Sequence, residues 1–454
     1  MTEPSETAPQ RGFWASVGPA IITASVVLGP GSILAASKTG HQFGYEMVWL
    51  LVLAGMLMVG MTALSARLGV TLEGTLCSEL ARRAGRPVAA ITGLSLFLIA
   101  ACFQFGNNLG VLAAIEPFYS QESTSDGSSL RVSVPILVIV NLNILVIVAL
   151  FGFSALYQPV ERLMKFLVGV MMVGFAANLL MAQPNIVEIL AGMIPGLPEG
   201  TSDTILPRWR EAAVTMSNGK VIDEGTVVDK FRPVVALFAT TFSVAGAFYQ
   251  SYLVRQKGWT KDNLHRGLVD SAVGIGVLGL ITMMIMVTAA AVLHGDDIEL
   301  KSVADVARQL EPAFGKFAMF LFCAGIFAGA FSSFLVNAMI GGSILADGFG
   351  LGGYIDQRWP KLFTVLALAI GLNVAIYVHM SGLKPVRLII FAQAITVLGF
   401  PLLAGAMLWL ATRGDMTGPR RIPLLLKLAA WVSLPILLFL ALRTAMTLLM
   451  PLIY

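Results

Sequence analysis

Two short uncharged segments rich in glycine and hydroxyl residues interrupt long hydrophobic stretches. The first is Gly29-Pro30-Gly31-Ser32, and the second is Ser243-Val244-Ala245-Gly246-Ala247. Proline lacks an amide hydrogen and glycine is conformationally permissive, so we do not expect a regular helix through the first segment. Unwound backbone within a membrane exposes carbonyl and amide groups that can hold ions or small polar solutes. The two segments therefore predict a neutral binding site.

The composition indicates that both segments lie in an integral membrane protein. The chain has 454 residues, of which 57% are hydrophobic and only 12% are charged. Soluble domains carry about 25% charged residues. The hydrophobic stretches are continuous rather than alternating, which is typical of membrane-spanning helices and not of a β-barrel. We therefore expect an all-α integral membrane protein surrounded by the lipid bilayer.

Eleven hydrophobic stretches are long enough to cross a bilayer. An odd number of spans in each half of a transporter gives the halves opposite orientations, so five plus five spans predict an inverted repeat in which span one corresponds to span six. The expected parts are a tail (1–13), a first half (14–181), an external connection (182–232), a second half (233–412) and a final span (413–454). The expected spans are 14–38, 46–66, 89–115, 132–152, 159–181, 234–254, 268–293, 316–345, 362–380, 385–412 and 424–449.

Basic residues are concentrated in the loops after spans two, four, six and ten. The positive-inside rule makes these loops cytoplasmic, which places the N-terminus inside and the C-terminus outside a plasma (inner) membrane. The basic residues of these loops include Arg82, Arg83, Arg86, Arg162, Lys165, Arg255, Lys257, Arg413 and Arg420.

Several motifs in order along most of the chain resemble the Nramp family of proton-coupled divalent-metal transporters. The resemblance implies a LeuT-like fold that works by alternating access around a site between spans one and six. The motifs are Gly18-Pro19-Ala20, Gly29-Pro30-Gly31-Ser32, Phe43-Gly44-Tyr45, Leu64 to Gly69, Ser332-Ser333, and Ala392-Gln393 followed by Phe400-Pro401. The candidate substrate-binding residues are Val26, Gly29, Gly31, Ser32, Ser243, Val244, Ala245, Gly246 and Gln393.

The chain departs from the family pattern where the metal would bind. The family has Asp-Pro-Gly-Asn in span one, where this chain has Gly29 to Ser32. The family's Met-Pro-His-Asn in span six has no Met, Pro or His counterpart between Ser243 and Phe248. Acidic residues on the family's proton route correspond to Gln104 and Asn107, which do not titrate in the physiological range. These amides line either a cavity or a contact between helices.

The remaining chemistry favours a hydrated ion. Ser32 and Gln393 are the candidate side-chain metal ligands, and both supply neutral oxygen. Mg²⁺ keeps several of its waters and needs few direct protein ligands. We therefore expect a secondary transporter of an inorganic divalent cation, Mg²⁺ or Mn²⁺, with weak or no proton coupling. We expect no enzyme activity, cofactor, ATP or nucleic acid.

Two alternative functions stay open. Amide groups near Gly31 and Gly246, at the starts of half-helices, could instead hold an amino acid or another small organic solute. Phe248, Tyr249 and Tyr252 would then wall the ligand. The other alternative is a sensor paralogue that does not transport.

Asp270, near the start of span seven, is an acidic residue close to the membrane. An acid in such a position is a candidate for function. Because Arg266 is four residues away, we expect Asp270 to form a salt bridge or gate at the cytoplasmic end of the span.

Overall fold

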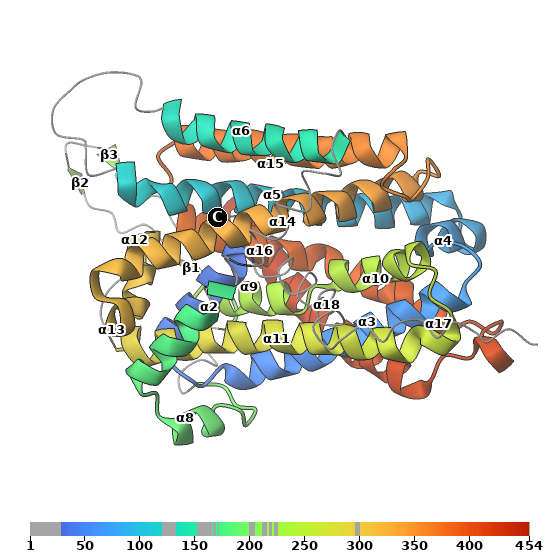
Figure 1. Cartoon of the computed structure of the whole chain (residues 1–454), viewed down its shortest axis with the longest axis horizontal. Helices are drawn as coiled ribbons and strands as arrows, with labels where there is room; N and C mark the ends of the chain where they lie inside the picture. The colour runs from blue at the N-terminus through green and yellow to red at the C-terminus, as the bar shows by residue number, and fades with distance from the viewer. Residues whose placement is uncertain are drawn as a thin grey trace, which may run out of the picture.

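The computed structural model describes residues 29–119, 133–151, 166, 169–170, 172–198, 205–210, 216–217, 220–221, 226–295 and 300–453. Its long helices lie side by side in one bundle (Figure 1). Val26 and the first half of span one lie outside the described residues.

In the described ranges, eight helical segments are long and apolar enough to cross a membrane. They confirm the expected spans two, three and six to eleven as helices, and the shorter α6 (Ser133–Phe151) matches span four. A helical segment at Met172–Ala182 covers the end of span five, so the full count of eleven stays a prediction. The long helices are α3 (Val48–Thr71), α5 (Arg86–Tyr119), α9 (Arg232–Thr241) with α10 (Val244–Gln256), α11 (Lys261–Leu293), α14 (Ala318–Gly348), α15 (Arg358–Met380), α16 (Pro385–Ile395) with α17 (Phe400–Ala411), and α18 (Leu424–Ile453).

The expected interruption of span one lies where α2 (Pro30–Phe43) begins. Gly29 precedes the helix in an extended conformation, with φ −87° and ψ 174°. Pro30 occupies the first helical position, where its missing amide hydrogen costs nothing. The proline therefore marks a helix start at membrane depth.

The interruption of span six is shorter than the sequence pattern predicts. Phe242 and Ser243 have the non-helical ψ angles 68° and 87°, whereas Val244 already belongs to α10. The expectation that residues 243–247 are unwound is therefore wrong beyond Ser243. Small residues such as Gly246 pack well inside membrane helices, so their presence alone does not mark a break.

Span ten is also irregular, because the 3₁₀ turn η5 (Thr396–Gly399) joins α16 to α17. A 3₁₀ stretch within a long helix often marks a functional hinge. It follows Gln393 by one helical turn, so the irregular backbone lies next to a predicted site residue.

The two ends of the bundle carry different connections. The short helix α4 (Leu76–Ala84) lies at one end, and α8 (Ile186–Ala191), α12 (Val303–Ala307) and α13 (Glu311–Phe314) lie at the other (Figure 1). The 182–232 connection includes α8 and two antiparallel strand pairs, in which β1 (Arg208–Arg210) pairs with β4 (Thr226–Val228) and β2 (Met216–Ser217) with β3 (Lys220–Val221).

A buried ion pair fastens this connection to α18. The side chains of Arg443 and Asp229 are 1% and 2% exposed, and two hydrogen bonds from the guanidinium to the carboxylate join them. Arg443 Nε also donates to the Ile205 carbonyl, and Arg232 Nε lies 3.4 Å from Asp229 Oδ2. The carboxylate is thus shared by two arginines.

We expect Asp229→Ala to destabilise the protein by about 3–5 kcal/mol, because it leaves the buried Arg443 guanidinium uncompensated. Thermal unfolding in detergent measures the effect, with the exposed Asp356→Ala as the control. The double variant Asp229→Ala/Arg443→Met should recover much of the loss. A single variant as stable as the wild type would contradict the role of this pair.

Candidate functional site

The interrupted helices meet at a small polar cavity of about 30 Å³. Side chains or backbone from α2, α5, α9, α10, α14 and α16 surround it, so five expected spans contribute. Its lining residues are Gly29, Gly31, Ser32, Phe103, Asn107, Thr240, Ser243, Gly246, Ser333, Asn337, Ile340 and Gln393. The structure therefore brings together most of the predicted site residues from both halves of the chain.

Local hydrogen bonds satisfy the start of α2. The Gly29 carbonyl accepts from the Ser32 amide at 3.1 Å, the Ser32 hydroxyl at 3.1 Å and the Ile33 amide at 3.3 Å. The Ser32 hydroxyl hydrogen is therefore donated inside the helix, and toward a ligand Ser32 acts as an oxygen acceptor. That role suits a cation.

The break in span six places two helix ends of opposite polarity together. The Ser243 hydroxyl oxygen accepts from the Gly246 amide at 3.3 Å and caps α10. The last carbonyl groups of α9 lack partners within their own helix, as at every helix end. A cation is favoured at the carbonyl end of α9 and an anion at the amide end of α10.

Two amide side chains in the lining have an unused polar atom. Gln393 Oε1 and Asn107 Nδ2 are buried and have no hydrogen-bond partner among the described residues. Buried polar groups are nearly always paired, and orphaned ones call for an explanation such as a bound ion or water. Gln393 Oε1 can accept from or coordinate a ligand in the cavity, whereas Asn107 Nδ2 can donate to a water or to a ligand oxygen.

Gly31 makes room for Gln393. A Cβ atom at Gly31 would lie 2.4 Å from Gln393 Cγ, and one at Gly106 would lie 2.7 Å from Gln393 Nε2. The long amide therefore fits between α2 and α5 only because both positions are glycine.

The other predicted residues lie outside the cavity lining. Val244 and Ala245 are buried in α10, and Gln104 Nε2 donates to the Phe334 carbonyl at 2.6 Å, which joins α5 to α14. Asp270 is half-buried on α11, and the side chain of its expected partner Arg266 lies outside the described residues, so the salt bridge or gate stays a prediction.

Five lining residues were not among the predicted site residues. Ser333 and Asn337 lie four residues apart on α14, as Phe103 and Asn107 do on α5, so each pair shares a helix face. Ser333 and Asn337, two polar residues one helical turn apart in an apolar span, were the sequence signal that could have identified this face of α14. The five residues are Phe103, Thr240, Ser333, Asn337 and Ile340.

The cavity lining contains no acidic, basic or histidine side chain. No group of three or more His, Cys, Asp or Glu residues that could hold a metal occurs in the described part of the chain. Phe248 and Tyr249, expected to wall an organic ligand, instead stack on Tyr252 with centroid distances of 6.4 and 5.9 Å. The site is neutral and oxygen-lined.

The family model described as "Natural resistance-associated macrophage protein-like" matches residues 20–447. The chain belongs to the Nramp family. It is 24% identical over 407 residues to a divalent metal cation transporter from Chromohalobacter salexigens, a match that covers 87% of this chain and 82% of the relative. It is 25% identical over 419 residues to a transporter of the same description from Deinococcus radiodurans, covering 88% and 83%.

Solved Nramp structures share this fold. A manganese transporter from Eremococcus coleocola superposes with a TM-score of 0.71 at 16% identity, covering 97% of this chain and 88% of that one. The predicted class, a multi-pass all-α membrane protein with a LeuT-like fold, is thereby confirmed.

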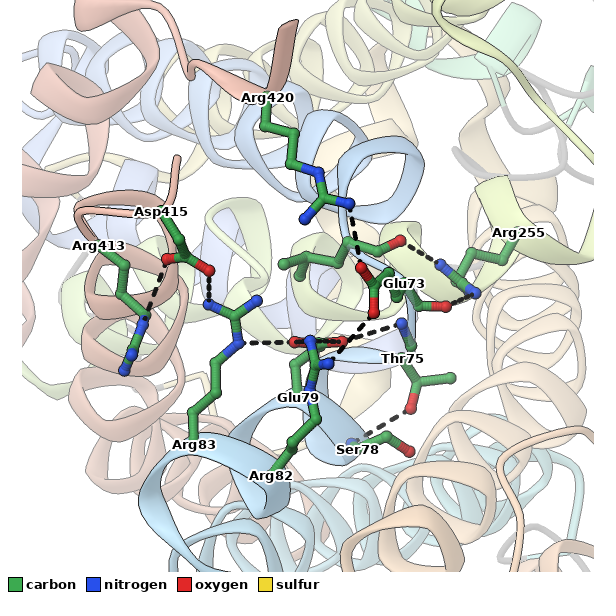
Figure 2. A network of polar contacts seen from close by, with 12 residues as sticks. Glu73, Thr75, Ser78, Glu79, Arg82, Arg83, Arg255, Arg413, Asp415 and Arg420 are labelled. Carbon is green, nitrogen blue, oxygen red and sulfur yellow. Dashed lines mark hydrogen bonds and ion pairs between the residues drawn. The ribbon is translucent and has the colours of Figure 1, made fainter. Parts of the chain in front are cut away.

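A polar network at the α4 end of this Nramp protein holds several segments together (Figure 2). Glu79 is 2% exposed and binds Arg82 Nη2 and Arg83 Nε, each at 2.7 Å. Burial raises the pKa of Glu79, but hydrogen bonds from both arginines and from the Gly74 amide outweigh burial and lower its pKa below the ordinary 4.5. The stabilisation is therefore present above pH 4.5 and is lost as the pH falls further.

The same network reaches the segments predicted to be cytoplasmic loops. Arg420 Nη2 contacts Glu73 at 3.0 Å, and Arg83 pairs with Asp415. Arg255, at the end of α10, donates to the Leu72 carbonyl at 2.9 Å and also to Glu73 (Figure 2). The ends of spans two, six and ten thus lie at one end of the bundle, as their basic residues predict.

A buried carboxyl group on α14 ties α10 to α4. Asp347 accepts hydrogen bonds from the hydroxyls of Thr75 at 2.5 Å, Ser78 at 2.9 Å and Tyr252 at 2.6 Å. The Cys77 amide in turn donates to the Tyr252 oxygen at 3.3 Å. Tyr252 lies nine residues beyond Ser243, about 13 Å along α10. This contact separates the cavity from the α4 end.

We expect Gly31→Ala to lower the stability by about 1–3 kcal/mol, because its Cβ would overlap Gln393. Thermal unfolding is the measurement, and Gly405→Ala is the matched control, since a Cβ there meets nothing within 4 Å. The double variant Gly31→Ala/Gln393→Ala should regain most of the loss. Equal destabilisation by both single glycine variants would refute the predicted contact.

We expect Tyr252→Phe to expose Cys77, which is fully buried beside the Tyr252 hydroxyl. Loss of a buried hydrogen bond worth about 1.4 kcal/mol makes local opening about tenfold more frequent. The rate of maleimide labelling measures it in a background without the other cysteines (Cys102→Ser, Cys323→Ala). The exposed Tyr377→Phe should label at the parent rate, and an unchanged rate in Tyr252→Phe would argue against the link.

Proposed function

We propose that this Nramp protein is a secondary transporter of an inorganic divalent cation, Mn²⁺ or Mg²⁺, in a plasma (inner) membrane. It works by alternating access and with weak or no proton coupling. The relatives support a divalent cation as the substrate, since they are named divalent metal cation transporters. The manganese transporter whose fold it shares supports the same class.

The cavity volume is the observation that carries this proposal. A water needs about 10–15 Å³ of such volume, so about 30 Å³ holds an ion with one or two waters. An amino acid or another organic solute needs a far larger cavity, and sites for small organic molecules measure about 300–1,000 Å³. The cavity favours an inorganic ion over an organic solute.

The ligand set suits a partly hydrated hard cation. Ser32 and Gln393, the predicted side-chain ligands, and the carbonyl end of α9 provide neutral oxygen around the cavity. With one or two waters in the cavity, an octahedral Mg²⁺ would take its remaining ligands from these oxygens, and oxygen ligands also suit Mn²⁺. Neutral oxygens bind a divalent cation more weakly than carboxylates do, which favours low affinity for the cation and its rapid release.

The neutral lining also supports transport without a proton. Asn107 lines the cavity at a position where the family has an acid, and no lining side chain exchanges a proton near neutral pH. A membrane potential of about 100 mV, negative inside, supplies about 4–5 kcal/mol for two charges. The potential alone can therefore drive cation entry.

Alternating access requires the α4 end to open. The bonds of Tyr252 and Arg255 hold α10 to α4, α14 and the end of α3. They must break for the cavity to reach that end, which the basic loops predict to be cytoplasmic. The η5 turn and the break at Ser243 are the places where the backbone can bend.

We expect proteoliposomes containing the full chain to take up Mn²⁺ in response to a negative-inside potassium diffusion potential. An internal pH dye should report no acidification matched to uptake. Ser32→Ala and Gln393→Ala should each reduce the uptake rate about tenfold, and the exposed Ser381→Ala should transport like the wild type.

Three results would contradict the proposal. Acidification of the vesicle interior in a fixed ratio to Mn²⁺ uptake would show that transport is coupled to protons. Uptake of an amino acid from a panel, without uptake of Mn²⁺ or Mg²⁺, would favour the organic-solute alternative. No transport of any substrate by a folded protein would favour the sensor alternative.

A further inference from the structure

A second polar pocket, the basic pocket, lies at the end of the bundle opposite α4. Its volume is about 320 Å³, which falls within the range of small-molecule sites. It is lined by Lys38, Gln42, Val227, Val228, Asp229, Lys230, Arg232, Pro233, Arg387 and Ile390.

The basic pocket lies over the central cavity along the same three helices. Lys38 is six residues beyond Ser32 on α2, and Arg387 is six residues before Gln393 on α16, which corresponds to about 9 Å along each helix. Arg232 begins α9, whose Thr240 lines the cavity. A solute that reaches the cavity between these helices from this end therefore passes the basic pocket.

Four of the lining side chains are cationic and one is a carboxylate. The carboxylate of Asp229 is already bound by the buried Arg443 and by Arg232. Lys38 is half-buried and forms no hydrogen bond or ion pair with a described residue. Among the described residues, the lining thus has four cationic side chains and a single acid, which Arg443 also shares.

Helix ends add to this positive charge. α9 and α16 both begin at the pocket, and neither has a side-chain cap for its first amide groups. Helix N-termini and lysine or arginine side chains all favour anions. By contrast, a bare divalent cation would be repelled there.

We propose that the basic pocket binds a small soluble oxyanion with at least two negative charges, such as a dicarboxylate, a tricarboxylate or a phosphate. The ligand's carboxylate or phosphate oxygens contact Lys38 and Arg387, and the pocket has room for a molecule of the size of citrate. This binding does not depend on the proposed cation transport, because it is measured without metal.

Isothermal titration of the full-length protein in a zwitterionic detergent, with citrate as the probe and acetate at equal ionic strength, tests the site. Citrate should bind and acetate should not. Lys38→Gln and Arg387→Gln should each weaken citrate binding at least tenfold, whereas Lys38→Arg should retain it. The charge-matched controls Lys257→Gln and Arg358→Gln, which are exposed residues outside the pocket lining, should bind like the wild type.

Equal citrate affinity in the pocket variants and the controls, with all proteins folded by thermal unfolding, would overturn the proposal. Nanodiscs distinguish a soluble ligand from a lipid headgroup. The same citrate affinity in phosphatidylcholine discs with and without phosphatidylglycerol supports the soluble ligand. Loss of citrate binding in the phosphatidylglycerol discs would show that a lipid headgroup occupies the cationic side chains of the pocket, and it would refute the proposal of a soluble ligand.

The effect of a bound anion on cation uptake rests on the proposed function, and a separate experiment tests it. If an anion in the pocket offsets its positive charge, saturating phosphate should raise Mn²⁺ uptake by the wild type several-fold at constant free Mn²⁺. Lys38→Gln should lose that stimulation. Citrate binding without any Mn²⁺ uptake would refute the cation transport and leave the anion site standing.

Discussion

The need to satisfy interrupted backbone inside a membrane shapes the centre of this molecule. An unpaired carbonyl or amide group in hydrocarbon costs several kcal/mol, so non-helical backbone is tolerated there only when protein surrounds it. The hydroxyl of Ser32 bonds the Gly29 carbonyl, and that of Ser243 accepts from the Gly246 amide. The remaining helix-end groups face a cavity that α5, α14 and α16 complete. The candidate site is therefore the small cavity beside the two interruptions.

A neutral centre moves the charges to the two ends of the bundle. Ionised groups are costly at membrane depth, and the cavity lining has none. At one end, the Glu79 network and Asp347 hold α4, α10 and α14 together. At the other end, the described lining of the basic pocket has four cationic side chains and one acid. In the proposed transport cycle the first arrangement must open, and in the proposed anion site the second meets a solute before it reaches the cavity. The charged side chains of these two groups thus lie toward the ends of the bundle and not in the cavity lining.

Sequence patterns predicted the helices well because length and hydropathy alone identify a membrane span. Pro30 also located the start of α2 correctly, since proline is favoured at the first helical position. The extent of the second break was misjudged because Gly246 and its small neighbours serve helix packing equally well. Asn337 and Phe103 were missed because the face that a helix turns inward depends on its rotation. Lys38 and Arg387 lie hundreds of residues apart, so no local pattern could indicate that they share a pocket.

The side chains around Gly29 leave little room for the aspartate that the family resemblance predicts at this position. A Cβ atom at Gly29 would lie 3.2 Å from Ser333 Oγ and 3.5 Å from Asn107 Oδ1, so the space around an aspartate there is already partly occupied. Gln393 similarly fills the space beside Gly31 and Gly106. The position is thus packed for a small residue, which agrees with the neutral hydroxyl and amide lining of the cavity.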